Sequence, residues 1–326
     1  AVADGVDVIN YSIGGGASLG GGDEIAFLFA ADAGVFVATS AGNSGPGAAT
    51  IGGPGSVPWL TTVGASSHSR AFISDITVSG PPTPPTGLWG GSLTTGIENY
   101  NLVDADTVAG GTNGECLNPF PAGTFQADDA VLCNRYNFGV ARTERVANVA
   151  AGGGGAVIIH NVSSNHPNIT PTDNHPLPTV HMLYDVGQPL KDYLLANPGQ
   201  VTVSITQNMA RYAGEDPRVV PNFMASFSSR GPDPVAEDII KPDVTAPGVS
   251  ILAAASPIHA GSAAQGQYFQ AIMGTSMSSP HVAGLFALVK QAHPDWSPAV
   301  AKSALMTTAY QDVVKEDYVT PADPFD

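Results

Sequence analysis

GTSMSSPHVAG, residues 274–284, places a serine where a turn is expected to become a helix. Gly274 permits a tight bend before Ser276. We expect Pro280 to lie in the first turn of the helix, where its missing N–H costs little. The helical spacing of the apolar residues that follow predicts one apolar face, formed by Val282, Ala283, Leu285, Phe286, Leu288 and Val289.

Ser276 fits two roles on this pattern. A lone Ser before an apolar helical run is ordinarily a helix N-cap. The same position suits a nucleophile, because the N–H groups and dipole at a helix start favour an oxyanion that forms when an acyl group is attacked. The segment differs from the nucleophile elbow of α/β-hydrolases, which would need Gly at position 278, where this chain has Ser278.

Two further segments each read as a strand followed by glycines. The first is GVDVINYSIGG, residues 5–15, and the second is VFVATSAGNSGP, residues 35–46. In the first, Gly14 and Gly15 leave the backbone unobstructed, so that an extended peptide could pair with it. A buried parallel strand that ends in a loop explains the same residues. Asn43, before Ser-Gly-Pro, is by default a turn residue.

Together the three segments resemble the motifs of the subtilisin-like serine peptidases, the subtilases. The resemblance implies that Ser276 is the nucleophile and that Asn43 donates its side-chain amide to the oxyanion. It also implies a strand that binds an extended protein or peptide substrate, and part of the wall of the main side-chain pocket. The strand would comprise Ser12, Ile13, Gly14 and Gly15, and the wall Ala41 and Gly42.

The fold class expected is α/β, with a doubly wound, mostly parallel sheet. Acidic residues open an apolar helical stretch at 25–33, strands are expected at 35–39 and 59–63, and this order implies parallel pairing. Residues 76–214 differ, with Pro-rich and Asn-rich connections around short strands at 130–133 and 156–160 and a helix at 140–151. This part resembles the smaller α/β protease-associated domain that larger subtilases carry as an insertion. We therefore expect catalytic segments at 1–75 and 215–326.

Charge, hydropathy and cysteine content limit the classes of partner and cofactor that this protein is expected to bind. A net charge of −16 argues against binding to nucleic acid. No apolar run approaches eighteen residues, so we expect no membrane span. Cys116 and Cys133 are expected to form a disulfide in a secreted protein, because a metal site would need further ligands nearby. The chemistry needs no cofactor; related enzymes often bind structural calcium, but no Asp-rich loop here locates a site.

A serine nucleophile needs a general base and a carboxylate to orient it. In subtilases these are an Asp and a His in sequence contexts that this chain does not contain. His281 matches a helix residue of the family pattern rather than the base. None of the histidines has the expected setting: His68, His160, His166, His175, His181, His259, His281 and His293.

We therefore expect the chain to be a fragment, inactive alone, of a longer precursor or zymogen. The catalytic Asp and His would come from an N-terminal segment of that precursor. Related enzymes also continue beyond the point where this sequence ends. Two alternatives stay open. The chain could be a pseudopeptidase used for binding, or residues 76–214 could be the working part, as a peptide-binding module.

Overall fold

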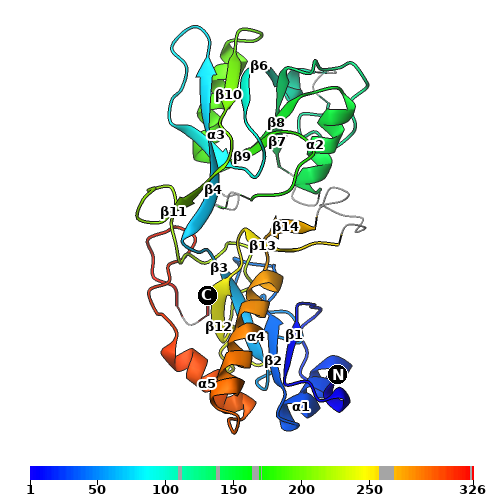
Figure 1. The fold of residues 1–326 in the computed structure, drawn as a ribbon, viewed down its shortest axis with the longest axis vertical. Coiled ribbons are helices and arrows are strands. Elements are labelled where there is room, and N and C mark those ends of the chain that lie inside the picture. The colour runs from blue at the N-terminus through cyan, green and yellow to red at the C-terminus, as the bar shows by residue number, and fades with distance from the viewer. Residues whose placement is uncertain (109–111, 137–139, 164–168, 170, 257–267, 324) are drawn as a thin grey trace. The chain divides into compact units, whose positions relative to one another are not determined.

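The computed structural model describes residues 1–326 apart from 109–111, 137–139, 164–168, 170, 257–267 and 324 (Figure 1). The chain divides into two compact units. Unit 1 comprises Ala1–Ser69, Val220–Ile251 and Met273–Asp326, and unit 2 comprises Arg70–Val219 and Leu252–Ile272. The chain thus enters unit 2 twice, whereas composition suggests a single excursion over residues 76–214.

Unit 1 is built on a parallel sheet. Its strands, in spatial order, are β1 (Val8–Tyr11), β2 (Phe36–Ser40), β3 (Thr61–Ser66) and β12 (Val244–Pro247), and every neighbouring pair is parallel. All residues of β2 and β3 are buried. Strands covered on both faces are expected to lack exposed polar positions, as these do.

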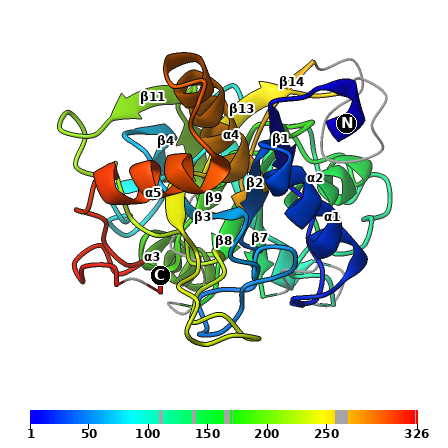
Figure 2. The same cartoon turned by 90° about the horizontal axis from the view of Figure 1, so that it is seen from below.

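Helices cover both faces of this sheet, which confirms the doubly wound arrangement. They are α1 (Gly22–Asp32), α4 (Thr275–Ala292) and α5 (Pro298–Thr308), in addition to the short 3₁₀ helix η1 (Val2–Asp4). Phe36 packs with Phe286 of α4, while Val37 packs with Ala30 of α1. Successive strand residues point to opposite faces, so α4 and α1 lie on opposite sides of β2 (Figure 2).

Unit 2 holds a mixed sheet that closes on itself. Its spatial order is β10-β6-β7-β8-β9-β5-β4-β11, and β10 also pairs with β4. The run from β6 to β9 is parallel and the other pairings are antiparallel. The strands are β4 (Arg70–Ser79), β5 (Leu88–Gly91), β6 (Ile97–Asp104), β7 (Asp129–Arg135), β8 (Ala156–Asn161), β9 (Thr179–Met182), β10 (Thr202–Ile205) and β11 (Met209–Tyr212).

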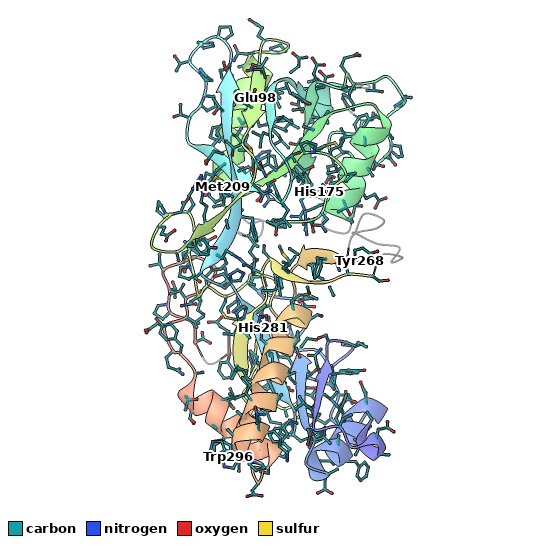
Figure 3. All side chains as sticks on the ribbon, in the orientation of Figure 1. Glu98, His175, Met209, Tyr268, His281 and Trp296 are labelled. Carbon is teal, nitrogen blue, oxygen red and sulfur yellow. A yellow bond between two sulfur atoms is a disulfide. The ribbon has the colours of Figure 1, made fainter. Side chains whose placement is uncertain are left out.

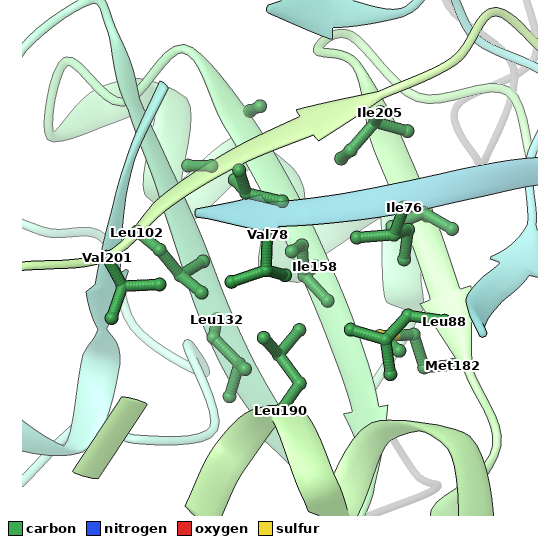
Figure 4. Close-up of a cluster of buried hydrophobic side chains, with 14 of the residues drawn as sticks. Ile76, Val78, Leu88, Leu102, Leu132, Ile158, Met182, Leu190, Val201 and Ile205 are labelled. Atoms are coloured by element: carbon green, nitrogen blue, oxygen red, sulfur yellow. The ribbon is translucent and has the colours of Figure 1, made fainter. Parts of the chain in front are cut away.

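The core of unit 2 lies between this sheet and α3 (Tyr184–Ala196). Leu190 of α3 packs there with Leu132 and Ile158, which come from the parallel strands (Figure 4). A second cluster includes Val146 and Val149 of α2 (Arg142–Ala151) and the Cys116–Cys133 disulfide, whose Cα atoms are 5.8 Å apart. The structure thus contains the predicted disulfide. The remaining elements are η2 (Ala105–Thr107) and the strand pair β13 (Ile251–Ala254) and β14 (Phe269–Ile272).

No helix in the described residues is both long enough and apolar enough to cross a membrane.

Candidate active site

Ser276 lies at the start of α4, immediately after the helix's first residue, Thr275. The N-cap, Gly274, has φ 156° and ψ 159°, a backbone region that glycine alone occupies readily. Ser276 is half-buried, and its Oγ donates a hydrogen bond to the carbonyl oxygen of Ser12 at 3.3 Å. The serine is therefore held at the helix start that the sequence pattern indicated.

Thr275 fixes the orientation of the Asn43 side chain. The Thr275 backbone N–H and its Oγ1 both donate to Asn43 Oδ1, each at 3.0 Å. The Gly42 N–H in turn donates to Thr275 Oγ1 at 3.2 Å. Because the amide oxygen accepts both bonds from Thr275, the amide nitrogen Nδ2 is turned to the other side and can donate elsewhere.

The space beside the Gly274 Cα is bordered by two nitrogen atoms and by the Met277 sulfur, which a Cβ on Gly274 would meet at 3.5 Å. A methyl group added to Gly274 would lie 3.6 Å from Asn43 Nδ2 and 3.7 Å from the Ser276 backbone nitrogen. Two donors that flank one opening next to a hydroxyl are the arrangement that an oxyanion requires. A side chain at position 274 would fill this opening, which gives the glycine a second reason besides its backbone angles.

The segment predicted to bind substrate follows β1 directly. Ser12 is half-buried, and Ile13 is 65% exposed. Gly15, however, exchanges both of its backbone hydrogen bonds with Gly53, at 2.9 and 3.0 Å. Its N–H and C=O are therefore already used within the chain, which corrects the expectation that they are free to pair with a peptide.

Ala41 and Gly42 follow β2 and lie beside Asn43. Ala41 is fully buried, and Gly42 has φ 107°. A Cβ on Gly42 would stand 2.7 Å from Ser229 Oγ. Position 42 thus requires glycine for both its backbone angle and its close packing.

Pro280 does not lie in the first turn as expected; it lies inside α4. In a helix, the Ser276 carbonyl would accept from the backbone N–H of the residue four positions later. That residue is Pro280, which has no N–H. The Ser12 hydroxyl donates to that carbonyl instead, at 2.9 Å. The sequence pattern alone did not reveal this contact.

The histidines of unit 1 have other partners. His281 lies on α4 (Figure 3), and its Nδ1 is 2.8 Å from the Met277 carbonyl oxygen. His68 Nε2 is 2.9 Å from the Val249 carbonyl, and His293 stacks on Trp296. In the described part of the chain, the acceptor bonded to Ser276 Oγ is the Ser12 carbonyl and not a histidine. His166 and His259 lie outside the described residues.

No group of three or more His, Cys, Asp or Glu side chains in the described ranges is arranged to hold a metal ion.

Comparison with known proteins places the sequence of this chain in a family. The model of the subtilase family matches residues 1–322. From Arabidopsis thaliana, subtilisin-like protease SBT1.7 is 36% identical over 95% of this chain and 41% of its own length. SBT1.3 is 36% identical over 100% of this chain and 43% of its own. The chain therefore spans about two fifths of the length of these relatives.

Solved structures match at lower similarity. The psychrophilic subtilisin-like protease Apa1 from Pseudoalteromonas sp. AS-11 is 16% identical, with a TM-score of 0.38 over 95% of this chain and 66% of that chain. Sphericase is 18% identical, with a TM-score of 0.40 over 96% of this chain and 53% of that chain.

Proposed function

The chain belongs to the subtilase family, and from this premise we propose that it carries the nucleophile and oxyanion-binding part of a serine endopeptidase active site. The observation that carries the proposal is the shared opening beside Gly274, bordered by Asn43 Nδ2 and the Ser276 nitrogen. The helix-cap role does not fit Ser276, because the N-cap of α4 is Gly274 and Ser276 Oγ donates to the Ser12 carbonyl.

In this mechanism Ser276 Oγ attacks the carbonyl carbon of the scissile peptide bond, and its proton passes to a general base. The carbonyl oxygen becomes an oxyanion that Asn43 Nδ2 and the N-terminus of α4 stabilise. Collapse of this intermediate expels the amine, which takes the proton, and leaves an acyl group on Ser276. Water then hydrolyses the ester and restores the serine.

The general base and its carboxylate partner are assigned to another segment of the same protein. The hydrogen bond of Ser276 Oγ to Ser12, in place of a histidine, supports this assignment within the described residues. Substrate would lie along Ser12, Ile13 and Gly14, with Ala41 and Gly42 at the wall of the side-chain pocket. Backbone pairing of this kind accepts extended peptides of many sequences.

Unit 2 is proposed to be a protease-associated domain in a secreted enzyme. The disulfide supports secretion, because such bonds persist in oxidising compartments. A second candidate function, peptide binding by unit 2 without catalysis, would leave Ser276 unreactive.

Fluorophosphonate labelling of the full-length protein tests the proposal. We expect a single labelled serine, Ser276, and no labelling of a Ser276→Ala variant. Residues 1–326 expressed alone should turn over a chromogenic peptide about 10⁶-fold more slowly than the full-length protein, the loss known for removal of the catalytic His in subtilisin, which we adopt. Rapid turnover by this chain alone, abolished by Ser276→Ala, would mean that one of its own histidines is the base. An unlabelled, correctly folded full-length protein would favour the binding function.

A further inference from the structure

The Ser276 carbonyl is in an unusual position for a helix carbonyl. In an α-helix the carbonyl of each residue accepts from the N–H four residues later. For Ser276 that residue is Pro280, which lies inside α4 and has no N–H to give. A carbonyl left without a donor in a half-buried site costs free energy, so another donor is needed.

Ser12 supplies this donor from outside the helix. Its Oγ donates to the Ser276 carbonyl at 2.9 Å, while Ser276 Oγ donates back to the Ser12 carbonyl at 3.3 Å. Two hydrogen bonds of opposite direction therefore join these serines, which are 264 positions apart in sequence.

A short chain of hydrogen bonds orients the Ser12 hydroxyl. Ser279 Oγ donates to Asn10 Oδ1 at 2.7 Å, and Asn10 Nδ2 donates to Ser12 Oγ at 3.0 Å. Because Ser12 Oγ accepts from Asn10, its own proton is directed to the Ser276 carbonyl. This series of hydrogen bonds begins at Ser279 on α4, passes through Asn10 and Ser12 at β1, and ends at the Ser276 carbonyl on α4.

We propose that the Ser12 hydroxyl is a positioning group for the nucleophile, replacing the helical N–H that Pro280 removes. This inference rests on the proposed function and adds a role for the Ser12 side chain, whose segment was assigned to substrate binding through its backbone. Ser12 acts through the Ser276 peptide group and not on the reacting atoms.

The expected consequence is kinetic. Freed from Ser12, the Ser276 peptide can tilt, and small misplacements of a reacting group lower the rate of the chemical step. The Ser12→Ala variant should lose about threefold to tenfold in kcat with little change in KM. Ser12→Thr, which keeps a hydroxyl at the same position, should recover most of the loss. Ser303→Ala, at an exposed position on α5, serves as the matched control.

The decisive experiment combines Ser12→Ala with Pro280→Ala in the full-length protein, with both kcat and the free energy of unfolding measured. Pro280→Ala supplies a backbone N–H four residues after Ser276, so the Ser12 bond becomes redundant. We expect Ser12→Ala to lower kcat and stability clearly when Pro280 is present. In the Pro280→Ala background the same substitution should lower kcat by less than about twofold.

Each outcome decides the matter. Equal effects of Ser12→Ala in both backgrounds would show that Ser12 does not replace the helical donor. A rise in KM at unchanged kcat would make the Ser12 hydroxyl a substrate contact, and failure of Ser12→Thr to recover kcat would make the effect one of packing. If the wild-type protein were not labelled by fluorophosphonate, the proposed function would fail and this catalytic role with it. The stability cycle would still show whether the bond forms.

Discussion

The candidate site of unit 1 and the interior of unit 2 depend on different interactions. The site is a set of neutral donors and acceptors, in which Thr275 holds Asn43 and Ser12 holds Ser276. Unit 2 instead buries charge and a disulfide: Arg142 forms an ion pair with Asp173, and Lys191 Nζ lies 2.7 Å from Asp104 Oδ2. Acid and reductant should therefore act on unit 2 while leaving the hydrogen bonds of the site intact.

Two buried histidines of unit 2 have lowered pKa values. Burial lowers the pKa of His175 to about 4; the nearby Asp173 carboxylate opposes this and Arg142 adds to it. Burial also lowers the pKa of His181 well below its usual value, with repulsion from Arg135 as the next cause. Both rings are consequently neutral in the folded protein near neutral pH.

The largest effect should come from the neutral side of the comparison. We expect Asn43→Ala to lower kcat about 10²–10³-fold, the range known for loss of an oxyanion donor in subtilisin, which we adopt. Steady-state kinetics of the full-length protein measure this, and Ser303→Ala is the control. The free energy of unfolding should also fall, by about 1–3 kcal/mol, because the buried Thr275 N–H and hydroxyl lose their acceptor. A loss of less than about threefold would remove Asn43 from the oxyanion site.

Loss of the disulfide should weaken unit 2 alone. The Cys116→Ala/Cys133→Ala double variant removes a cross-link for which the chain-entropy model gives about 3 kcal/mol. Trp89 lies in β5 of unit 2, whereas Trp59 and Trp296 lie in unit 1. With Trp59 and Trp296 replaced by Phe, the denaturant midpoint seen by Trp89 should fall. The reciprocal Trp89→Phe protein should show an unchanged unit 1 transition, and reductant should have no further effect on the double variant.

Acid should destabilise unit 2 through His175, which lies in that unit (Figure 3). The pKa of this ring is about 4 when folded, below its ordinary value of 6.5. The unfolded chain therefore binds the proton more readily, and stability falls as pH drops below 6.5 towards 4. At about pH 5 the loss from this group is about 2 kcal/mol.

The His175→Gln variant tests this assignment. Between about pH 7 and pH 5, the free energy of unfolding of unit 2 should fall by about 2 kcal/mol less in this variant than in the wild type. His281→Gln, an exposed substitution on α4 of unit 1, is the matched control, because it leaves every group of unit 2 in place. Identical pH dependence in His175→Gln and wild type would contradict the role given to His175.

The smallest expected effect concerns the helix cap of unit 1. Ser297 Oγ accepts from the Val300 N–H at 3.3 Å, and Pro298 opens α5. Ser297→Ala should cost about 1 kcal/mol, measured as a lower midpoint of the unit 1 transition. Unit 2 should be unaffected. A shift equal to that of Ser303→Ala would show that the cap contributes nothing.

Local patterns predicted much of unit 1. The helix start beside Ser276 follows from a glycine before an apolar run. The expected place of Pro280 was wrong because α4 begins at Thr275, so that Pro280 is its sixth residue and lies beyond the first turn. The contact of Asn10 with Ser279 could not be predicted, because it joins residues 269 positions apart that only the sheet topology brings together.

The interior of unit 2 was harder to predict for the same reason. Alternating apolar strands and a helix could be recognised, yet the pairing of Arg142 with Asp173 spans 31 positions and has no local signature. Nor did composition indicate that Leu252–Ile272 belongs with this unit. The Asn174 side chain donates to the Phe269 carbonyl at 2.9 Å, a contact between its two separate stretches.

The double entry of the chain into unit 2 has a consequence for synthesis on the ribosome. Within unit 2, residues 70–219 are made first. The unit lacks its last piece until residue 272 has been made, after an intervening stretch that belongs to unit 1. At about 5–20 residues per second, those 53 residues between 219 and 272 take roughly 3–10 s. During that interval the nascent protein holds a nearly complete unit 2 and a unit 1 that still lacks α4, so the helix that carries Ser276 joins its sheet last but for α5 and the C-terminal residues.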